Sequence, residues 1–261
     1  MDSADLDALR RAKAILETPG LAIRIADKAG MPIEALVRRL PSGAQEAVAS
    51  ATRTALGKSL EFALRTLDPG ERGPPIDWFH RGVVIASGAA GGAMGLPGLV
   101  LELPFSLTVM LRSIADHARA HGEDLSLVQA RLKCLTVFAY GAPAKGDDAA
   151  DSAYFASRAV LARAVSQATE YVAGKGIAGA LGEKSAPALA QLIAKVAQRL
   201  GVAVTDKAAA QLVPIAGAAG GAAINALFIN HYQDIASAHF TVRRLERAHG
   251  VDAVRRAWDK L

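Results

Sequence analysis

Residues 88–94 read GAAGGAM and residues 217–223 read GAAGGAA, so nearly the same seven letters recur about half a chain apart. Each copy lies in a long stretch without charged residues. Glycine at four-residue spacing, as in Gly88 and Gly92, places bare backbone on one side of a helix. Another helix or an acyl chain can approach such a surface closely. We therefore expect two central glycine-rich helical hairpins, related as a weak internal repeat and packed against each other.

The composition favours an all-α helical bundle. The chain has 261 residues, of which 51% are hydrophobic and only 5% aromatic. A core with few large rings must be filled by small and aliphatic side chains, which suits closely packed helices better than a β-sandwich. The Pro- and Gly-rich stretch 68–75 interrupts the pattern. It predicts an amino-terminal helical region over 1–70 and a helical domain over 76–261, or one continuous domain.

The charge distribution and the cysteine content limit the classes of binding partner and the cellular compartment that we expect. The net charge of +5 comes from 30 basic and 25 acidic residues mixed along the chain, without the basic stripe and stacking aromatics of a nucleic-acid-binding protein. We expect no nucleic-acid partner. Cys134, the single cysteine, has apolar neighbours and is predicted to be a buried core residue in a reducing compartment. The acidic amino terminus is no secretory signal, so we expect a cytoplasmic protein, either free or peripheral to the inner face of the membrane.

Helix-breaking residues and helix-capping residues predict where a series of helices begins and ends. We expect Pro104 in the first turn of a helix to about His121. Ser42 with Gln45 is predicted to cap a helix to about Leu67, and Asp124 one to about Tyr140. The other predicted helices cover 3–17, 21–39 with an interruption near 30–32, 149–173, a segment from 185–187 to Gly201, and a segment that follows Pro214 to about Arg247.

Two uncharged runs raise the question of membrane spans. The first, Val83–Leu101, has 19 residues, but Gly95 to Gly98 divide it and Glu102 follows at once. Each piece is too short to cross a bilayer, so a buried hairpin or shallow interfacial insertion is expected. The second, Ala208–Asn230, has 23 residues and is rich in alanine and glycine. A central helix of a bundle explains it better than a span.

Familiar catalytic and cofactor motifs are missing or out of context. Residues 174–179, GKGIAG, fit GxGxxG by letters but follow a helical segment instead of a strand, which indicates an inter-helix turn. His117 and His121 lie one helical turn apart, yet no third metal ligand has a fixed spacing. The sequence contains neither a GxSxG nor an HExxH motif. We predict no metal and no cofactor.

The most informative polar residues follow Glu102. If this stretch is one helix, Ser106, Ser113, Asp116 and His117 lie within about 60° of the direction of Glu102, with Arg112 to one side. Such a polar stripe on an apolar helix must find partners, face water or serve a site. The structural interpretation pairs Arg112 with Asp116 and bonds Glu102 to backbone amides. The catalytic alternative joins Glu102 to Asp116 or His117.

The segments ASGAAGGAMGLPGLVLELP (86–104), LRSIADHARAHGED (111–124) and VPIAGAAGGAAINALF (213–228) together resemble the EcsC family. The likeness extends from about Trp78 to the carboxyl terminus, with His121 where relatives often have tyrosine. It implies a helical protein in or near a membrane, and no settled reaction. The positions that it marks as ligand-binding or site-shaping are Gly95, Pro97, Gly98, Glu102, Pro104, Arg112, Asp124, Gly217, Gly221 and Asn225, where Asn225 is expected to form hydrogen bonds between helices.

Two main functions follow as expectations. The first is a non-enzymatic accessory protein that binds lipid or another apolar ligand, or docks on the cytoplasmic membrane face, because small-residue segments can admit acyl chains or insert shallowly. The second is a hydrolase that uses Glu102 with Asp116 or His117 near the GLPG turn. A helical scaffold for a protein partner is a third, which a large exposed apolar patch would support.

Overall fold

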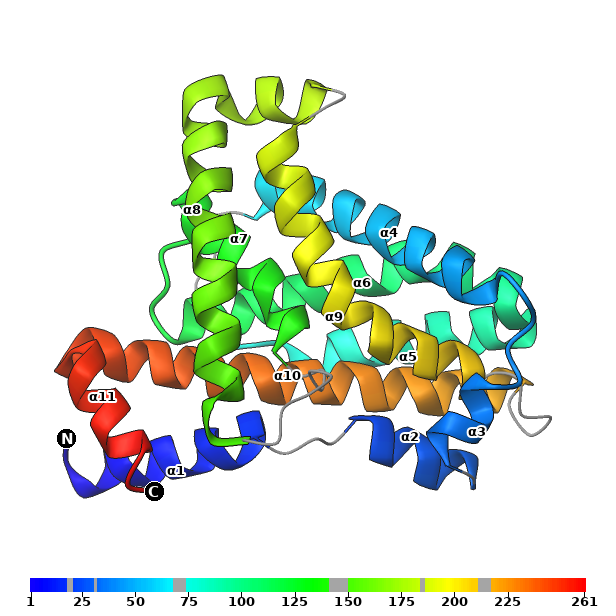
Figure 1. Ribbon diagram of the computed structural model, residues 1–261, viewed down its shortest axis with the longest axis horizontal. Coiled ribbons are helices and arrows are strands. Elements are labelled where there is room, and N and C mark those ends of the chain that lie inside the picture. Colours follow the sequence, from blue (N-terminus) through cyan, green and yellow to red (C-terminus); the bar gives the residue numbers. More distant parts are fainter. Residues whose placement is uncertain (18–20, 31, 68–73, 141–149, 184–185, 211–216) are drawn as a thin grey trace.

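The protein is a bundle of α-helices, which confirms the predicted fold class (Figure 1). The computed structural model describes residues 1–17, 21–30, 32–67, 74–140, 150–183, 186–210 and 217–261, and no strand occurs among them. The helices are α1 Ser3–Glu17, α2 Leu21–Ala29, α3 Ile33–Val37, α4 Ala44–Thr66, α5 Asp77–Ala93, α6 Gly95–Ala120, α7 Val128–Thr136 with the 3-10 turn η1 Val137–Ala139, α8 Ala150–Gly182, α9 Pro187–Ala210, α10 Gly217–His249 and α11 Val251–Trp258.

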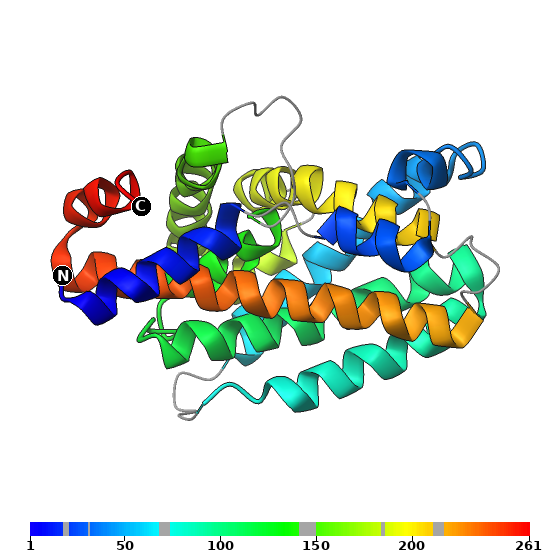
Figure 2. The ribbon, with the colours of Figure 1, turned by 90° about the horizontal axis from the view of Figure 1, so that it is seen from below.

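The two glycine-rich segments meet at the centre of the bundle. Figure 2 shows α10 running along the molecule beside α6 and α5. A Cβ built on Gly221 of α10 would lie 2.1 Å from the carbonyl oxygen of Gly88 and 2.7 Å from the Cα of Gly92, both in α5. Only glycine permits this approach of two backbones. The first segment ends α5 of the α5–α6 hairpin; the second begins α10, and its link to α9 lies outside the described residues.

The GLPG motif makes the turn of the α5–α6 hairpin. Met94 joins the helices, and Gly95 has a φ of +63°, which favours glycine. The predicted start of the second helix at Pro104 is wrong, because α6 begins at Gly95 and Pro104 lies inside it. The proline ring removes the backbone donor for the carbonyl of Val100, but this residue lies at the surface, where water can take over that role.

Three other predicted helix ends are also wrong. The amino-terminal cap of α4 is Gly43, with a φ of +79° and no side-chain hydrogen bond, instead of the box formed by Ser42 and Gln45. Asp124 accepts the backbone N–H of Ser126 at 2.9 Å, before α7 begins. Gly201 lies inside α9. Helix α8 continues past the predicted end and bends at Gly176, whereas residues 68–73, 141–149 and 184–185 lie outside the described part.

The two ends of the chain pack together and share one core with the rest. Leu9 of α1 and Trp258 of α11 are fully buried in the same hydrophobic cluster. The Trp258 indole donates a hydrogen bond to Glu17 at 3.0 Å, and the termini lie at the same end of the molecule in both views (Figures 1 and 2). Helix α4 packs on α6 and α9, so the helices before and after residue 70 belong to one packed unit.

Candidate functional site

Glu102 lies buried where α5, α6, α9 and α10 meet. Its Oε2 lies 2.9 Å from the Nζ of Lys207 on α9. Its Oε1 accepts hydrogen bonds from Asn225 of α10 at 2.7 Å and from Ser87 of α5 at 3.1 Å, and Ser106 also donates to it. One carboxylate thus holds four helices, and we call these five residues the central cluster.

An ion pair and hydrogen bonds compensate the buried charges of Glu102 and Lys207, whereas the buried Oδ1 of Asn225 has no hydrogen-bond partner among the described residues. Burial lowers the pKa of Lys207, and the facing charge of Glu102 opposes this effect. The ammonium group also lies 5.4 Å from the centre of the Phe228 ring, a distance that suits a cation–π contact. Both partners are buried, so the pair replaces much of the hydration that each charge has lost. The central cluster therefore orders the crossing of the glycine-rich helices.

Two expectations for this region have different outcomes. Asn225 does form hydrogen bonds between helices, since its Nδ2 also donates to the carbonyl of Val84 at 2.7 Å. The expected bonding of Glu102 to backbone amides is wrong, because the partners of its carboxylate are side chains. Sequence reasoning missed Lys207. Lys207 could have been recognised because it is the last charged residue before 23 uncharged ones, and a cation buried there needs a partner.

The carboxyl-terminal part of the α6 stripe has separate partners. The Nε2 of His117 lies 3.1 Å from Oδ1 of Asp77 on α5, and Arg119 donates to Asp116 at 2.9 Å. Burial lowers the pKa of His117 more than the charge of Asp77 raises it. Buried Ser113 accepts a hydrogen bond from Gln233 of α10 at 2.9 Å. Each stripe residue is thus buried against its own neighbours.

The stripe does not converge on a common reacting atom. Glu102 and His117 are 15 positions apart on one helix, which corresponds to about 22 Å along its axis. Asp116 lies next to His117 in the chain. Burial lowers the pKa of nearby His80; the charge of Asp116 opposes this effect, and the charge of Arg112 adds to it. Within the described ranges, no three His, Cys, Asp or Glu side chains are placed to share a metal ion. The geometry gives the candidate acid and imidazole no shared pocket.

The GLPG turn presents apolar side chains to solvent. Met94 is 60% exposed, and on the first turns of α6 Val100, Leu101 and Phe105 are 39%, 70% and 52% exposed. We call these four residues the hairpin patch. Gly98 supports the turn, since a Cβ there would lie 2.2 Å from the carbonyl oxygen of Gly91. The site-shaping residues Gly95, Pro97, Gly98 and Pro104 thus belong to the hairpin, whereas Asp124 lies beyond the far end of α6.

An open groove of about 370 Å³ lies beside the hairpin patch, between α4 and α6. Val100, Leu101 and Pro104 form the α6 wall, and α4 contributes small side chains and Lys58. No acidic residue lines this groove within the described part of the chain. The remaining lining residues are Ala47, Ser50, Ala51 and Thr54. The groove and the patch form one continuous surface through Val100 and Leu101.

Among the described residues, α6 alone is long and apolar enough to cross a bilayer, by length and composition. Its most apolar window is 61% buried inside the bundle, and a core helix of a soluble protein has the same character. The first uncharged run is divided between α5 and α6, as expected. The second includes the end of α9 and the start of α10, and its residues 211–216 lie outside the described part of the chain.

A scan against protein-family models matches the EcsC protein family over residues 24–245. The chain belongs to the EcsC family. The match starts before the expected Trp78 and ends before the carboxyl terminus, so it includes the last six residues of α2, all of α3 and α4, the central cluster and the hairpin patch. No curated protein and no solved structure matched the chain. Membership of the EcsC family does not by itself specify an activity, which depends on the surfaces and sites of the chain.

Proposed function

We propose that the protein docks on the cytoplasmic face of a membrane that contains anionic lipid. The hairpin patch and the groove between α4 and α6 are its binding surface. The observation that carries the proposal is the exposure of Leu101 and Phe105, one turn apart on α6, beside an apolar groove with Lys58 among its lining residues. Large apolar side chains gathered at a helical turn are typical of interfacial insertion.

The energetics of shallow insertion are favourable. Burying one large apolar side chain contributes about 1.5–3 kcal/mol, and the four residues of the hairpin patch are already partly exposed to water. An interfacial helix inserts about 5–10 Å, a depth that side chains on one face of α6 can reach without opening the bundle. The buried partners of Glu102 keep the other face of α6 in place.

Lys58 supports the choice of anionic lipid. It lines the groove together with the apolar side chains of α6, so an acyl chain can lie against Leu101 while the ammonium group faces a headgroup phosphate. One basic residue near an anionic surface contributes about 1 kcal/mol. The net charge of +5 acts in the same direction.

The test is vesicle co-flotation with phosphatidylcholine alone and with added phosphatidylglycerol. We expect the wild type to float with the anionic vesicles, and Leu101→Glu to reduce the bound fraction at least about fivefold, because a carboxylate replaces the most exposed side chain of the hairpin patch. Val160→Glu is the matched control, since Val160 is 52% exposed but lies on α8. Equal flotation of the two variants, or no flotation of the wild type, would contradict the proposal.

A fluorescent reporter tests the depth of docking. Phe105→Trp keeps an aromatic ring at a half-exposed position of the hairpin patch. Because native Trp78 and Trp258 also emit, the signal of this reporter is the difference between the spectra of the variant and the wild type. It is expected to move to shorter wavelength with anionic vesicles and to be quenched by lipids brominated along the acyl chain. Retention of the solution spectrum in the presence of bound vesicles would assign the contact to another surface.

A further inference from the structure

A second surface feature is a cavity of about 240 Å³ between α7, α8 and α10. Its volume is below the about 300–1,000 Å³ of pockets for drug-sized ligands. The cavity is lined by Lys133 of α7, Arg158 of α8 and Arg243 of α10, and by no carboxylate among the described residues. The other lining residues are Gln129, Thr136, Tyr140, Leu161, Ala162, Val165 and His239.

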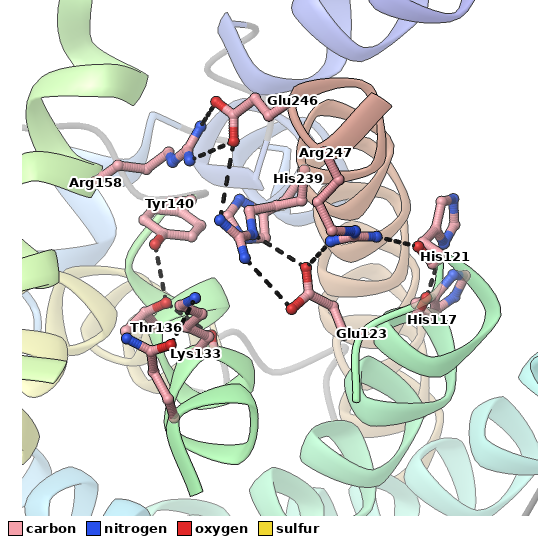
Figure 3. Close-up of polar contacts among 12 residues, drawn as sticks. His117, His121, Glu123, Lys133, Thr136, Tyr140, Arg158, His239, Glu246 and Arg247 are labelled. Atoms are coloured by element: carbon pink, nitrogen blue, oxygen red, sulfur yellow. Dashed lines mark hydrogen bonds and ion pairs between the residues drawn. The ribbon is translucent and has the colours of Figure 1, made fainter. Parts of the chain in front are cut away.

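Positive charge exceeds negative charge around this cavity. Arg158 makes two hydrogen bonds with Glu246, at 2.7 and 2.8 Å, and Arg243 donates to Glu123 at 3.1 Å. Arg247 also pairs with Glu123, so three arginines share these two carboxylates, and Lys133 adds a fourth positive charge. Figure 3 shows the group, with Tyr140 between Arg158 and Lys133 in this view.

Lys133 is the cation with the weakest partner. Within the described chain its ammonium group has one hydrogen bond, to the Oε1 of Gln129 at 3.4 Å. Burial lowers the pKa of Lys133, and the charge of Arg243 lowers it further, whereas Glu123 has the opposite effect. The negative charge of an anion in the cavity would raise the pKa of Lys133 and so offset the effects of burial and of Arg243.

His239 adds an unpaired donor in the wall of the cavity. The side chain is buried, its Nδ1 lies 2.8 Å from the Tyr154 hydroxyl, and its Nε2 has no hydrogen-bond partner among the described residues. Burial lowers the pKa of His239 well below its ordinary value, so the ring is neutral. The Tyr154 hydroxyl can donate to Nδ1, which leaves the proton on Nε2. Nε2 itself has almost no accessible surface, so contacts with a ligand in the cavity come from the three cations and not from this N–H.

We propose that this cavity binds a phosphate monoester through Lys133, Arg158 and Arg243. The cations come from three helices, so they reach the ligand from different sides, and a phosphate group offers three peripheral oxygens and up to two negative charges. Leu161, Ala162 and Val165 supply the apolar wall for the ester carbon. The phosphate can belong to a soluble metabolite or to a lipid headgroup, and the inference does not depend on the hairpin patch.

Calorimetry at constant ionic strength tests the site with glycerol 3-phosphate and with soluble dihexanoylphosphatidic acid. We expect the wild type to bind at least one of them with a Kd below about 1 mM. Lys133→Gln should weaken binding about tenfold, because one charge-assisted contact is lost. Arg163→Gln removes the same charge from an exposed position of α8 that does not line the cavity, and should change the Kd less than about twofold.

A second variant leaves the buried contacts intact. Ala162 lines the cavity from an exposed position, so Ala162→Glu brings a carboxylate to the ligand without disturbing the core, and binding should be lost. Tighter binding of dihexanoylphosphatidic acid than of glycerol 3-phosphate assigns the site to a lipid headgroup. Equal affinity, or tighter binding of glycerol 3-phosphate, assigns it to a soluble ester. No binding by the wild type, or unchanged binding by folded Lys133→Gln and Ala162→Glu, overturns the proposal.

Discussion

The ammonium nitrogen of Lys207 lies 2.9 Å from Oε2 of Glu102, although the two residues are 105 positions apart in the chain. Both side chains are almost completely enclosed, so neither charge has water to replace a lost partner. In such a pair, removal of one member leaves an uncompensated buried charge, whereas removal of both can be nearly neutral.

Glu102→Gln is expected to lower the free energy of unfolding by about 3–5 kcal/mol, because Lys207 then remains charged without a counter-ion. The double variant Glu102→Gln/Lys207→Met should lose less than the sum of the two single variants. Urea unfolding of the four proteins measures the coupling. Strict additivity would mean that the ion pair contributes nothing.

Gly221→Ala is expected to cost more than about 2 kcal/mol, since its Cβ would lie 2.1 Å from the backbone oxygen of Gly88 and force α10 away from α5. The matched control is Gly201→Ala in α9, where a Cβ would meet no atom within 4 Å. The control should gain up to about 1 kcal/mol from higher helix propensity. Thermal unfolding followed by circular dichroism compares the two, and equal melting temperatures would argue against the close contact.

Asp206 makes stability depend on pH. Burial, with a smaller effect of Glu34, raises its pKa from 3.8 to about 6. The native state therefore holds this proton more tightly than the unfolded state, and stability falls as the pH rises from about 4 to about 6. Asp206→Asn should stabilise the protein by at most about 3 kcal/mol at pH 7.5 and have little effect below the ordinary carboxyl pKa.

Denaturant unfolding at several pH values measures this difference. Asp252→Asn, at an exposed position of α11, is the control and should change stability by less than about 0.5 kcal/mol. A loss of stability in Asp206→Asn at every pH would show that the ionised carboxylate is needed in the fold.

Cys134 is expected to be inert in the native protein. Its side chain is fully buried, as the sequence predicts, and burial raises the pKa of its thiol to about 12. The reactive thiolate is therefore scarce at neutral pH. Ellman's reagent should label the thiol only after unfolding, so the labelling rate reports on opening of the core around α7. Rapid labelling of the folded protein would contradict this burial.

The fold was accessible from the sequence because its main signals are local. The glycine spacing predicts the contact of α5 with α10. The GLPG sequence predicts the hairpin turn, in which Gly95 has a positive φ. Pro104 misled the prediction because a proline inside a helix is tolerated where the orphaned carbonyl lies at the surface. The predicted caps at Ser42 and Asp124 failed for another reason: α4 starts after Gly43 without a side-chain cap, and Asp124 binds the N–H of Ser126 before α7 begins.

The sites were less accessible because they join distant segments. The stripe on α6 could be recognised by its period, and Asn225 by its place after the second glycine segment. The pairing of Glu102 with Lys207 depends on how α9 crosses α6, which no local pattern specifies. The cations around Lys133 come from three helices, and each alone resembles an ordinary surface charge.

The residues of the central cluster are synthesised at very different times, which bears on when the core can close. The ribosome completes α6 before Lys207 and Asn225 exist, and these residues follow Glu102 by 105 and 123 positions. Until they emerge, the carboxylate has only the hydroxyls of Ser87 and Ser106 within the cluster. Closing this core around an uncompensated charge is unfavourable, so we expect α6 to stay hydrated until the last long helix arrives. We therefore expect Glu102 to delay closure of the bundle until almost the whole chain is present.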